Sequence, residues 1–569
     1  MMAAELREAR RRHARACAML EARRWDEAMR EFEQAFALDA SCAIDRRTCF
    51  DWFRTLQIDE IAPFWLSELT RFFRRDDIDK FRYAMAGLQA LRAKPAFRAL
   101  GAAAGIPPET RYAPDAAALD EVMRDALFRL LLRDALVAFS PFELSLTRLR
   151  RALLLDETLR GRAPLDFLCD FAQQCFNNEF VYAEERDETA AVVALAARVE
   201  SQLQAGNMDK RLQRCIAIVA MYCPLHTLPG IEKLAPATPA TDAFDQLLRR
   251  TVGEVLEERG LAAGIPALGA VTDATSLKVQ AQYEENPYPR WRSPDRWTPI
   301  SVADWIAQEV PNAPAAATLP AEPAMLLAGC GTGAEALALA TRIPGLRITA
   351  IDLSRASLAY AQRMAGALAV LGVTFRQADL LALGDWSETF DIVYCSGVLH
   401  HLRDPRQGLR ALARRLRPGG LMKLGLYSER ARAAIRAARG TIAAEGIEAT
   451  ATGIRAFRQR VLRSAPGEPL RKLLRARDFF TMSECRDMLF HVQEHEYRLP
   501  AVAEMIRGEG LQMLGLSRQM PPGALAAYRR SYPKDGAAND LGRWDEIEAA
   551  HPDLFAGMYH IWCRRPPGG

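Results

Sequence analysis

A glycine-rich turn near the middle of the chain carries the clearest chemical signal. The run AMLLAGCGTGAEALALATRI places Gly329, Gly331 and Gly333 between a short apolar segment and an alanine- and leucine-rich one. Glycines there let the chain turn tightly and let backbone amides approach a ligand without interference from Cβ atoms. Asp352 follows the turn by about 20 residues, a spacing at which a carboxylate binds ribose hydroxyls. The pattern predicts a site for a ligand that contains a ribose.

Three more polar residues follow at the ends of predicted strands. Asp379 ends the run VTFRQAD, where its carboxylate can accept a hydrogen bond from an adenine amino group. His400 and His401 follow the apolar run FDIVYC. Either histidine is a candidate general base, because histidine titrates near neutrality. A structural or cofactor-positioning role is the alternative for this pair.

A second histidine cluster lies nearer the C-terminus. His491, Glu494 and His495 in RDMLFHVQEHEYRLP have the H-x-x-E-H spacing of inverted zinc peptidases. On a helix, the two histidines would share one face. No third ligand is identifiable, and Pro500 would soon interrupt a helix, so we expect no metal site. We predict that the three residues line an acceptor site, with ordinary packing as the alternative.

These residues need a mainly parallel sheet to bring them together. Strands of such sheets present their ligand-binding residues at the carboxyl edge. The chain offers apolar runs of strand length that alternate with helical segments, the pattern of βαβ units. The predicted strands are Met325–Ala328, Leu346–Ile351, a third ending at Asp379, Phe390–Cys395 and a fifth after Pro418-Gly419-Gly420. We assign residues 324–569 to this α/β domain, with a helical insertion at about 430–498.

This ordered set resembles the class I S-adenosylmethionine-dependent methyltransferases, particularly the branch with a VLHHL-like segment after the fourth strand. The resemblance implies a Rossmann-like α/β fold and S-adenosylmethionine as the cofactor. A dinucleotide-binding fold is the alternative, but it more often shows G-x-G-x-x-G, whereas the three glycines here alternate. The implied cofactor-binding residues are Gly329, Gly331, Gly333, Asp352, Leu353, Asp379, Leu380, Ser396 and Tyr283.

One position departs from the family pattern. The family usually has an acidic residue two positions before the first glycine, where this chain has Leu327. The substitution predicts either weaker cofactor binding or a different residue in that role.

The segment QYEENPYPRWRSP lies just upstream, within the predicted N-terminal extension at residues 271–323. Pro287 and Pro289 would stiffen an extended chain there. Related enzymes place a lid at this point, often with a tyrosine near the amino-acid end of the cofactor, and the stretch is similar to one in bacterial tetratricopeptide-repeat methyltransferases. We assign Tyr283 to the cofactor and Tyr288 and Arg290 to the substrate, with packing between domains as the alternative.

The N-terminal half reads as helical. Residues 16–40 place Trp25, Ala28, Phe32 and Ala35 at helical spacing and resemble one tetratricopeptide repeat. No second clear copy follows, so an ordinary helical hairpin is the alternative. We divide this half into a helical region at 1–155 and a further bundle with linkers at 156–270. The candidate linkers are PATPAT (236–241) and AAGIPALGAV (262–271).

Composition narrows the class of protein. A chain of 569 residues suggests two to four domains, and a net charge of +4 argues against a protein that binds polyanions over its whole surface. The arginines between 430 and 477 suggest a local basic face for RNA or an acidic protein, but a solvated face is favoured. No apolar run approaches the roughly 20 residues that span a bilayer. The 11 cysteines form no CxxC pair, so we expect a cytoplasmic protein.

The sequence therefore predicts a methyltransferase with an all-α, tetratricopeptide-like region before its α/β domain. The expected reaction moves a methyl group to an N or O atom of a protein or peptide acceptor that the helical region recognises. Two alternatives remain: a small-molecule or RNA methyltransferase, and a non-catalytic scaffold with a degenerate domain.

Overall fold

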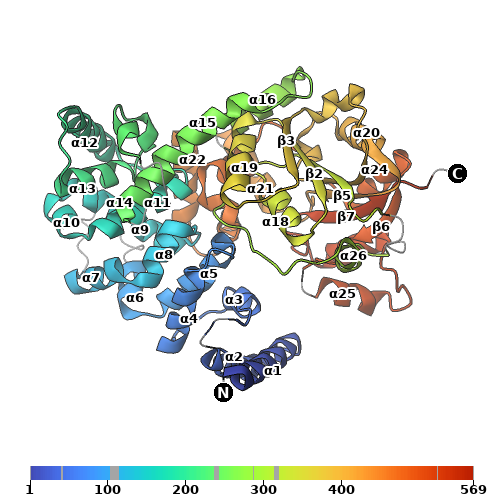
Figure 1. The fold of residues 1–569 in the computed structure, drawn as a ribbon, viewed down its shortest axis with the longest axis horizontal. Helices are drawn as coiled ribbons and strands as arrows, with labels where there is room; N and C mark the ends of the chain where they lie inside the picture. Colours follow the sequence, from blue (N-terminus) through green and yellow to red (C-terminus); the bar gives the residue numbers. More distant parts are fainter. Residues whose placement is uncertain are drawn as a thin grey trace. The chain divides into compact units, whose positions relative to one another are not determined.

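The computed structural model divides into two compact units, Met1–Val252 and Gly253–Gly569. It describes residues 2–567 apart from 40, 42, 103–114, 236–241, 286, 313–318 and 522, so the predicted linker PATPAT lies outside the described residues. Figure 1 colours the chain from blue at the N-terminus to red at the C-terminus. Over the described residues, every helix is too short or too polar to cross a membrane.

The first unit is helical, as its apolar spacing predicts. Its first two helices, α1 (Met2–Glu21) and α2 (Trp25–Leu38), form a hairpin in which Ala28, Phe32 and Ala35 are buried. Trp25 differs from its predicted neighbours: its side chain is 44% exposed and stacks on Trp52. The hairpin is compatible with one tetratricopeptide-like pair.

The other helices of the first unit pack into one cluster with no division near residue 155. They are α3 (Arg47–Phe53), α4 (Pro63–Phe73), α5 (Lys80–Arg92), α6 (Pro95–Ala102), α7 (Ala116–Arg124), α8 (Ala126–Asp134), α9 (Ser140–Leu155), α10 (Glu157–Arg162), α11 (Leu165–Asn177), α12 (Arg186–Gln204), α13 (Lys210–Val219) and α14 (Ala243–Leu248). Short 3-10 turns at Leu225–Thr227 and Ile231–Leu234, and a π-helical turn at Arg249–Gly253, complete the described part.

The second unit is built on a seven-stranded sheet with the order β3-β2-β1-β4-β5-β7-β6. The first five strands are parallel, and β7 runs antiparallel to both β5 and β6. This is the mainly parallel sheet that the sequence predicts. Its strands are β1 (Ala324–Ala328), β2 (Arg347–Asp352), β3 (Val373–Gln377), β4 (Phe390–Ser396), β5 (Leu416–Leu426), β6 (Gln512–Leu516) and β7 (Tyr559–Arg564).

Both faces of the sheet are covered, because its central strands alternate between two apolar cores. In β1, Leu326 and Ala328 belong to one core while Met325 and Leu327 belong to the other. The first core includes α20 (Pro405–Arg415), α24 (Leu499–Gly508), α25 (Ala524–Ser531) and α26 (Leu541–Ala550). The second includes α17 (Val302–Glu309), α18 (Ala334–Arg342) and α19 (Arg355–Ala367). Figure 1 shows α20 and α24 together, apart from α18 and α19.

The predicted linker at 262–271 is wrong. Helix α15 (Glu254–Gly264) packs against α19, and Ile265 is buried in the core on that face. The chain then forms an isolated parallel bridge from Ala267 to Gln377 at the edge of the sheet. Glycine and proline in this stretch mark a turn onto the sheet edge, so the second unit begins before it. Helix α16 (Ala274–Glu285) follows.

The predicted insertion at 430–498 is largely helical, but its arginines do not form a free basic face. It contains α21 (Ala433–Ala444), α22 (Ala451–Arg463), α23 (Met482–Phe490) and 3-10 turns at Pro469–Arg475 and Arg477–Phe480. Arg432 and Arg439 both bind Glu494, and the buried Arg458 donates to the Phe479 carbonyl. These cations therefore hold the insertion together.

Candidate functional site

The glycine turn joins β1 to α18 in a conformation that side chains resist. Gly329, Gly331 and Gly333 have φ angles of 70°, 51° and 79°. A Cβ atom on Gly331 would lie 2.5 Å from the Tyr288 carbonyl oxygen. The turn therefore needs glycine both for its left-handed backbone and for space. Gly333 forms the N-cap of α18 and does not line the pocket described below.

Asp352 lies at the carboxyl end of β2 and faces the turn. Its Oδ2 accepts from the Gly331 amide at 2.8 Å, and its Oδ1 accepts from the Ser354 amide at 2.9 Å. Burial raises the pKa of Asp352 against these two bonds, which lower it. The carboxylate is thus fixed beside the glycine amides, where a ribose would meet it.

Asp379 follows β3 by two residues and is buried. It caps the 3-10 turn Leu380–Asp385 by accepting from the Leu381 amide at 2.9 Å. Ile351, Leu353, Ala378 and Leu380 lie around the same end of the site and supply apolar surface. This combination of one carboxylate with apolar surface suits a flat nucleobase that has a polar edge.

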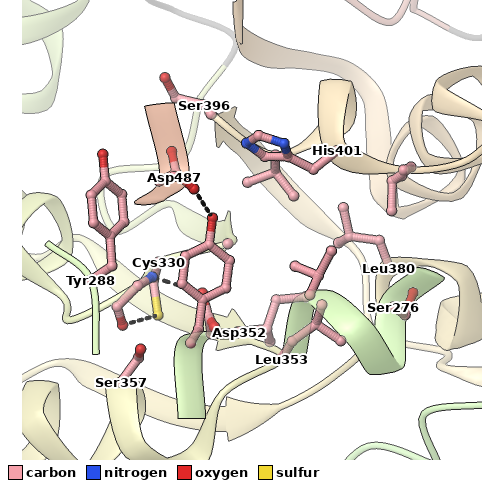
Figure 2. A pocket seen from close by; sticks show the side chains of 18 of the residues that line it. Ser276, Tyr288, Cys330, Asp352, Leu353, Ser357, Leu380, Ser396, His401 and Asp487 are labelled. Atoms are coloured by element: carbon pink, nitrogen blue, oxygen red, sulfur yellow. Dashed lines mark hydrogen bonds between the residues drawn. The ribbon is translucent and has the colours of Figure 1, made fainter. Parts of the chain in front are cut away.

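One pocket at the carboxyl edge of the sheet joins these groups. Its empty volume is about 1090 Å³, open solvent at its mouth included. In Figure 2, Asp352, Leu353 and Ser357 lie on one side of the pocket, and Ser396, His401 and Asp487 lie on the other. Eight of the nine predicted cofactor residues line it: Gly329, Gly331, Asp352, Leu353, Asp379, Leu380, Ser396 and Tyr283.

The segment after α16 docks directly onto the glycine turn. The Thr332 amide donates to the Tyr288 carbonyl at 3.2 Å, and the Trp291 indole donates to the Thr332 carbonyl at 3.1 Å. Of the two residues predicted to contact the substrate, Tyr288 lines the pocket and Arg290 is not among its lining residues. The lid therefore contributes two tyrosine side chains, Tyr283 and Tyr288, to the pocket wall.

The Tyr283 hydroxyl donates to Asp487 Oδ1 at 2.5 Å, the dashed line at Asp487 in Figure 2. Burial and the neighbouring Asp487 charge raise the pKa of Tyr283, so its hydroxyl remains a donor. Asp487 comes from α23, some 200 positions along the chain from Tyr283. This bond ties the lid to the insertion across the pocket.

The two predicted histidine clusters meet at this wall. The rings of His401 and His491 stack with centroids 3.8 Å apart, and His491 Nε2 lies 3.9 Å from Asp487 Oδ1. Burial lowers the pKa of His401 to about 3 and that of His491 to about 3. Both imidazoles are therefore neutral in ordinary buffers.

The other members of the two clusters lie away from the pocket. His400 is fully buried and stacks on Tyr427 at 3.9 Å, which fits a packing role. Glu494 is paired with Arg432 and Arg439, and His495 Nε2 lies 3.1 Å from the Leu402 carbonyl. Helix α23 ends at Phe490, so His491 and His495 do not lie on one face of a helix.

A third potential metal ligand lies outside the H-x-x-E-H segment. A ring nitrogen of His401, one of His491 and a carboxylate oxygen of Asp487 lie within 4.8 Å of one another. However, the Gln493 amide donates to His491 Nδ1 at 3.1 Å, which places the proton of this neutral ring on Nε2. A metal needs a lone pair at that atom. The hydrogen bonds thus argue against metal binding.

Sequence reasoning missed Asp487 and Tyr427, which also line the pocket. Asp487 precedes His491 by one helical turn, a spacing that pairs side chains. This spacing was the sequence signal that could have identified Asp487.

Leu327, which stands where the family pattern has an acid, is 3% exposed in the core beneath α18.

The open sheet, the glycine turn after β1 and the acids after β2 and β3 define a Rossmann-like nucleotide-binding domain. Residues 326–422 match the family model described as a methyltransferase domain. Together, these observations identify the second unit as a class I S-adenosylmethionine-dependent methyltransferase domain, with S-adenosylmethionine as its cofactor. The glycine turn, the fixed carboxylate and the apolar end of the pocket fit that cofactor.

Relatives match only part of the chain. An uncharacterized protein of Synechococcus sp. is 34% identical over 267 residues, 44% of this chain and 61% of the relative. A ubiquinone biosynthesis O-methyltransferase of Paracidovorax citrulli is 35% identical over 106 residues, 18% of this chain and 44% of the relative. The chain thus spans about half the length of these curated relatives.

Among solved structures, PKMT2 from Rickettsia typhi is similar with 15% identity and a TM-score of 0.34, over 43% of this chain and 48% of that one. The N-methyltransferase NodS from Bradyrhizobium japonicum has 25% identity and a TM-score of 0.17, over 19% of this chain and 53% of that one.

Proposed function

We propose that the protein transfers a methyl group from S-adenosylmethionine to an N or O atom of a protein or peptide, and that the helical first unit recognises this acceptor. The observation that carries the proposal is the shared pocket. The glycine turn and Asp352 lie on one side of it, and a buried polar group of His401 and Asp487 lies on the other.

The bound cofactor supplies an electrophilic methyl group on a sulfonium. The chain itself needs to hold the reactants in line, since alignment accounts for most of the catalysis in such a displacement. Asp352 and the glycine amides fix one end. Tyr283 and Tyr288 cover the pocket and exclude water, and His401 and Asp487 face the incoming acceptor.

The protein acceptor is supported by the presence of a separate helical unit of about 250 residues, since the described residues that line the cofactor pocket belong to the second unit. The α1–α2 hairpin of the helical unit is compatible with one tetratricopeptide-like pair. Binding energy from such remote contacts can align an acceptor at the reacting centre.

A small-molecule acceptor is the second candidate. The relatives that share the cofactor-binding part include ubiquinone biosynthesis O-methyltransferases. In addition, His401 and Asp487 are only 6% and 4% exposed, so the acceptor group that reaches them must be small or slender. A free metabolite or a long side chain would each fit.

Transfer of label from [methyl-³H]S-adenosylmethionine into fractionated lysate tests the proposal with the full-length protein. We expect label in macromolecules that protease releases and ribonuclease does not. Label confined to the low-molecular-weight fraction would favour the second candidate, and ribonuclease-sensitive label would indicate RNA. Absence of both label and S-adenosylhomocysteine binding would leave a scaffold. An Asp352→Ala protein is the control for background labelling.

A further inference from the structure

The backbone of a single residue, Gln493, orders the polar wall of the pocket. The Gln493 carbonyl lies 3.0 Å from His401 Nδ1, and the Gln493 amide donates to His491 Nδ1 at 3.1 Å. A carbonyl can only accept and an amide N–H can only donate. His401 therefore carries its proton on Nδ1, whereas the neutral His491 carries its proton on Nε2.

The two stacked imidazoles thus present opposite chemistry. His401 lines the pocket, and with its proton on Nδ1 it has a lone pair on Nε2. His491 has an N–H at Nε2, which lies 3.9 Å from Asp487 Oδ1. His491 Nε2 is buried and makes no hydrogen bond within the described residues. Asp487 accepts from Tyr283 through Oδ1, and a carboxylate has further lone pairs to offer. The pocket therefore holds two adjacent hydrogen-bond acceptors, His401 and Asp487.

We propose that His401 and Asp487 form the subsite for a primary amine, so that the methylated atom is nitrogen. This inference rests on the proposed function and specifies its acceptor. A neutral primary amine has two N–H bonds and one lone pair. When its two N–H bonds are held by two acceptors, its lone pair is left for the methyl group.

The spacing of the acceptors supports this geometry. Two hydrogen bonds of about 2.9 Å that leave one tetrahedral nitrogen end on atoms about 4.7 Å apart. One ring nitrogen of His401 and one carboxylate oxygen of Asp487 lie no more than 4.8 Å apart, which is compatible with that spacing. A hydroxyl has only one O–H and could donate to only one of the two acceptors at a time.

The reaction balances without a further reagent. The acceptor enters as the free amine, its ammonium proton having been left in solvent. The amine lone pair forms the N–C bond as the C–S bond breaks, and the electron pair of that bond stays on sulfur in S-adenosylhomocysteine. The positive charge passes to nitrogen, which keeps both protons as a secondary ammonium. The Asp487 carboxylate stabilises that charge.

Three aza analogues of S-adenosylhomocysteine test the subsite. Each replaces the sulfur with a nitrogen that carries a methyl, a 2-hydroxyethyl or a 2-aminoethyl arm. Calorimetry on the full-length protein should show that the aminoethyl analogue binds at least about tenfold more tightly than the hydroxyethyl analogue, because its arm forms charge-assisted hydrogen bonds. In Asp487→Asn, this ratio should fall to about one, and the affinity of the same variant for S-adenosylhomocysteine is measured beside it to separate a loss of preference from a loss of cofactor binding.

Glu504→Gln is the matched control, because its carboxylate lies on the surface with a side chain that is 70% exposed. It should keep the full preference. Equal or tighter binding of the hydroxyethyl analogue by the wild-type protein would overturn the amine assignment, and so would a preference that survives in Asp487→Asn. The wild-type comparison decides the matter even if the variant does not fold. A protein that fails to bind S-adenosylhomocysteine would instead refute the proposed function, and this inference with it.

Discussion

Removing the Asp352 carboxylate should weaken cofactor binding by a predictable amount. The two oxygens of Asp352 already accept one backbone amide each, from Gly331 and Ser354. They are therefore fixed in place before the cofactor arrives. An Asp352→Ala protein loses both the negative charge and this fixed orientation.

The magnitude follows from hydrogen bonds to a charged group. Each contributes about 1.5–3 kcal/mol to binding, and part of it is offset when water replaces the lost carboxylate. We expect a net loss of about 1–3 kcal/mol. This corresponds to a dissociation constant for S-adenosylhomocysteine that rises by about 5-fold to 150-fold.

Isothermal titration calorimetry of wild-type protein, Asp352→Ala and Asp352→Asn measures this loss. Asp553→Ala is the matched control, because Asp553 is exposed. Since Gly331 and Ser354 lose their acceptor, circular dichroism and a cooperative melt must first show that the variants are folded. Asp352→Asn keeps the shape without the charge and should fall between the wild type and Asp352→Ala.

Acidification gives a second readout of the same carboxylate. Burial raises the pKa of Asp352 above its ordinary value of 3.8, so the charge is lost earlier than from an exposed aspartate as the pH falls. The affinity of the wild-type protein should drop with it, whereas that of Asp352→Ala should not. A folded Asp352→Ala protein with the wild-type dissociation constant would refute the role of Asp352 in binding ribose.

Three further outcomes are expected. Elemental analysis should find no stoichiometric zinc in the purified protein, because the Gln493 amide occupies the lone pair of His491 Nδ1; one zinc per chain, lost in a His491→Ala/His495→Ala protein, would contradict this. A fragment of residues 253–569 should bind cofactor as tightly as the full chain but lose kcat/KM on the natural acceptor, and full turnover by the folded fragment would remove the first unit from recognition. The free energy of unfolding should fall as the pH drops from 6.5, by up to about 1.4 kcal/mol per pH unit for each of His401 and His491. The reason is that these histidines bind protons in the unfolded chain but not in the folded one. Urea titrations that give a His491→Gln protein the same pH slope as the wild type would count against this.

The second unit begins at Gly253, earlier than the composition of the sequence indicates. A boundary near Thr272 suits the glycine and proline content of the preceding stretch. In the fold, however, the Leu268 amide donates to the Gln377 carbonyl, and Arg363 binds Glu254 and Glu258 of α15. Composition signals where a chain turns, but it cannot show that the turning segment pairs with the edge of a sheet.

The cofactor half of the site was predictable because its residues follow from local patterns. Strand, glycine turn and helix are contiguous, and the acids sit where successive strands end. The sheet order places those ends together without further information. Hence most of the predicted cofactor residues line one pocket.

The polar wall with His401 and Asp487 was not predictable to the same degree. His401 and Asp487 are separated by a helix, a strand and most of the insertion, and nothing local indicates that they meet. The H-x-x-E-H spacing indicated a segment beside the pocket. It has meaning on a helix that continues through His495, however, and α23 ends at Phe490. The three residues of this spacing diverge: His491 stacks on the pocket residue His401, Glu494 pairs with Arg432 and Arg439, and His495 lies near the Leu402 carbonyl.

The contact between Gly331 and Tyr288 also affects which residues of such a domain would change first in evolution after a loss of activity. Position 331 has no room for a methyl group because the lid backbone occupies the space. The glycine is thus required by the fold whether or not any ligand binds. In a lineage that lost its activity, mutation would be free to change pocket residues with few structural partners long before it could change this glycine. In a descendant, an intact glycine turn would show only that the lid still packs on the turn. Loss of the polar wall would be the earlier sign that the protein is no longer an active enzyme.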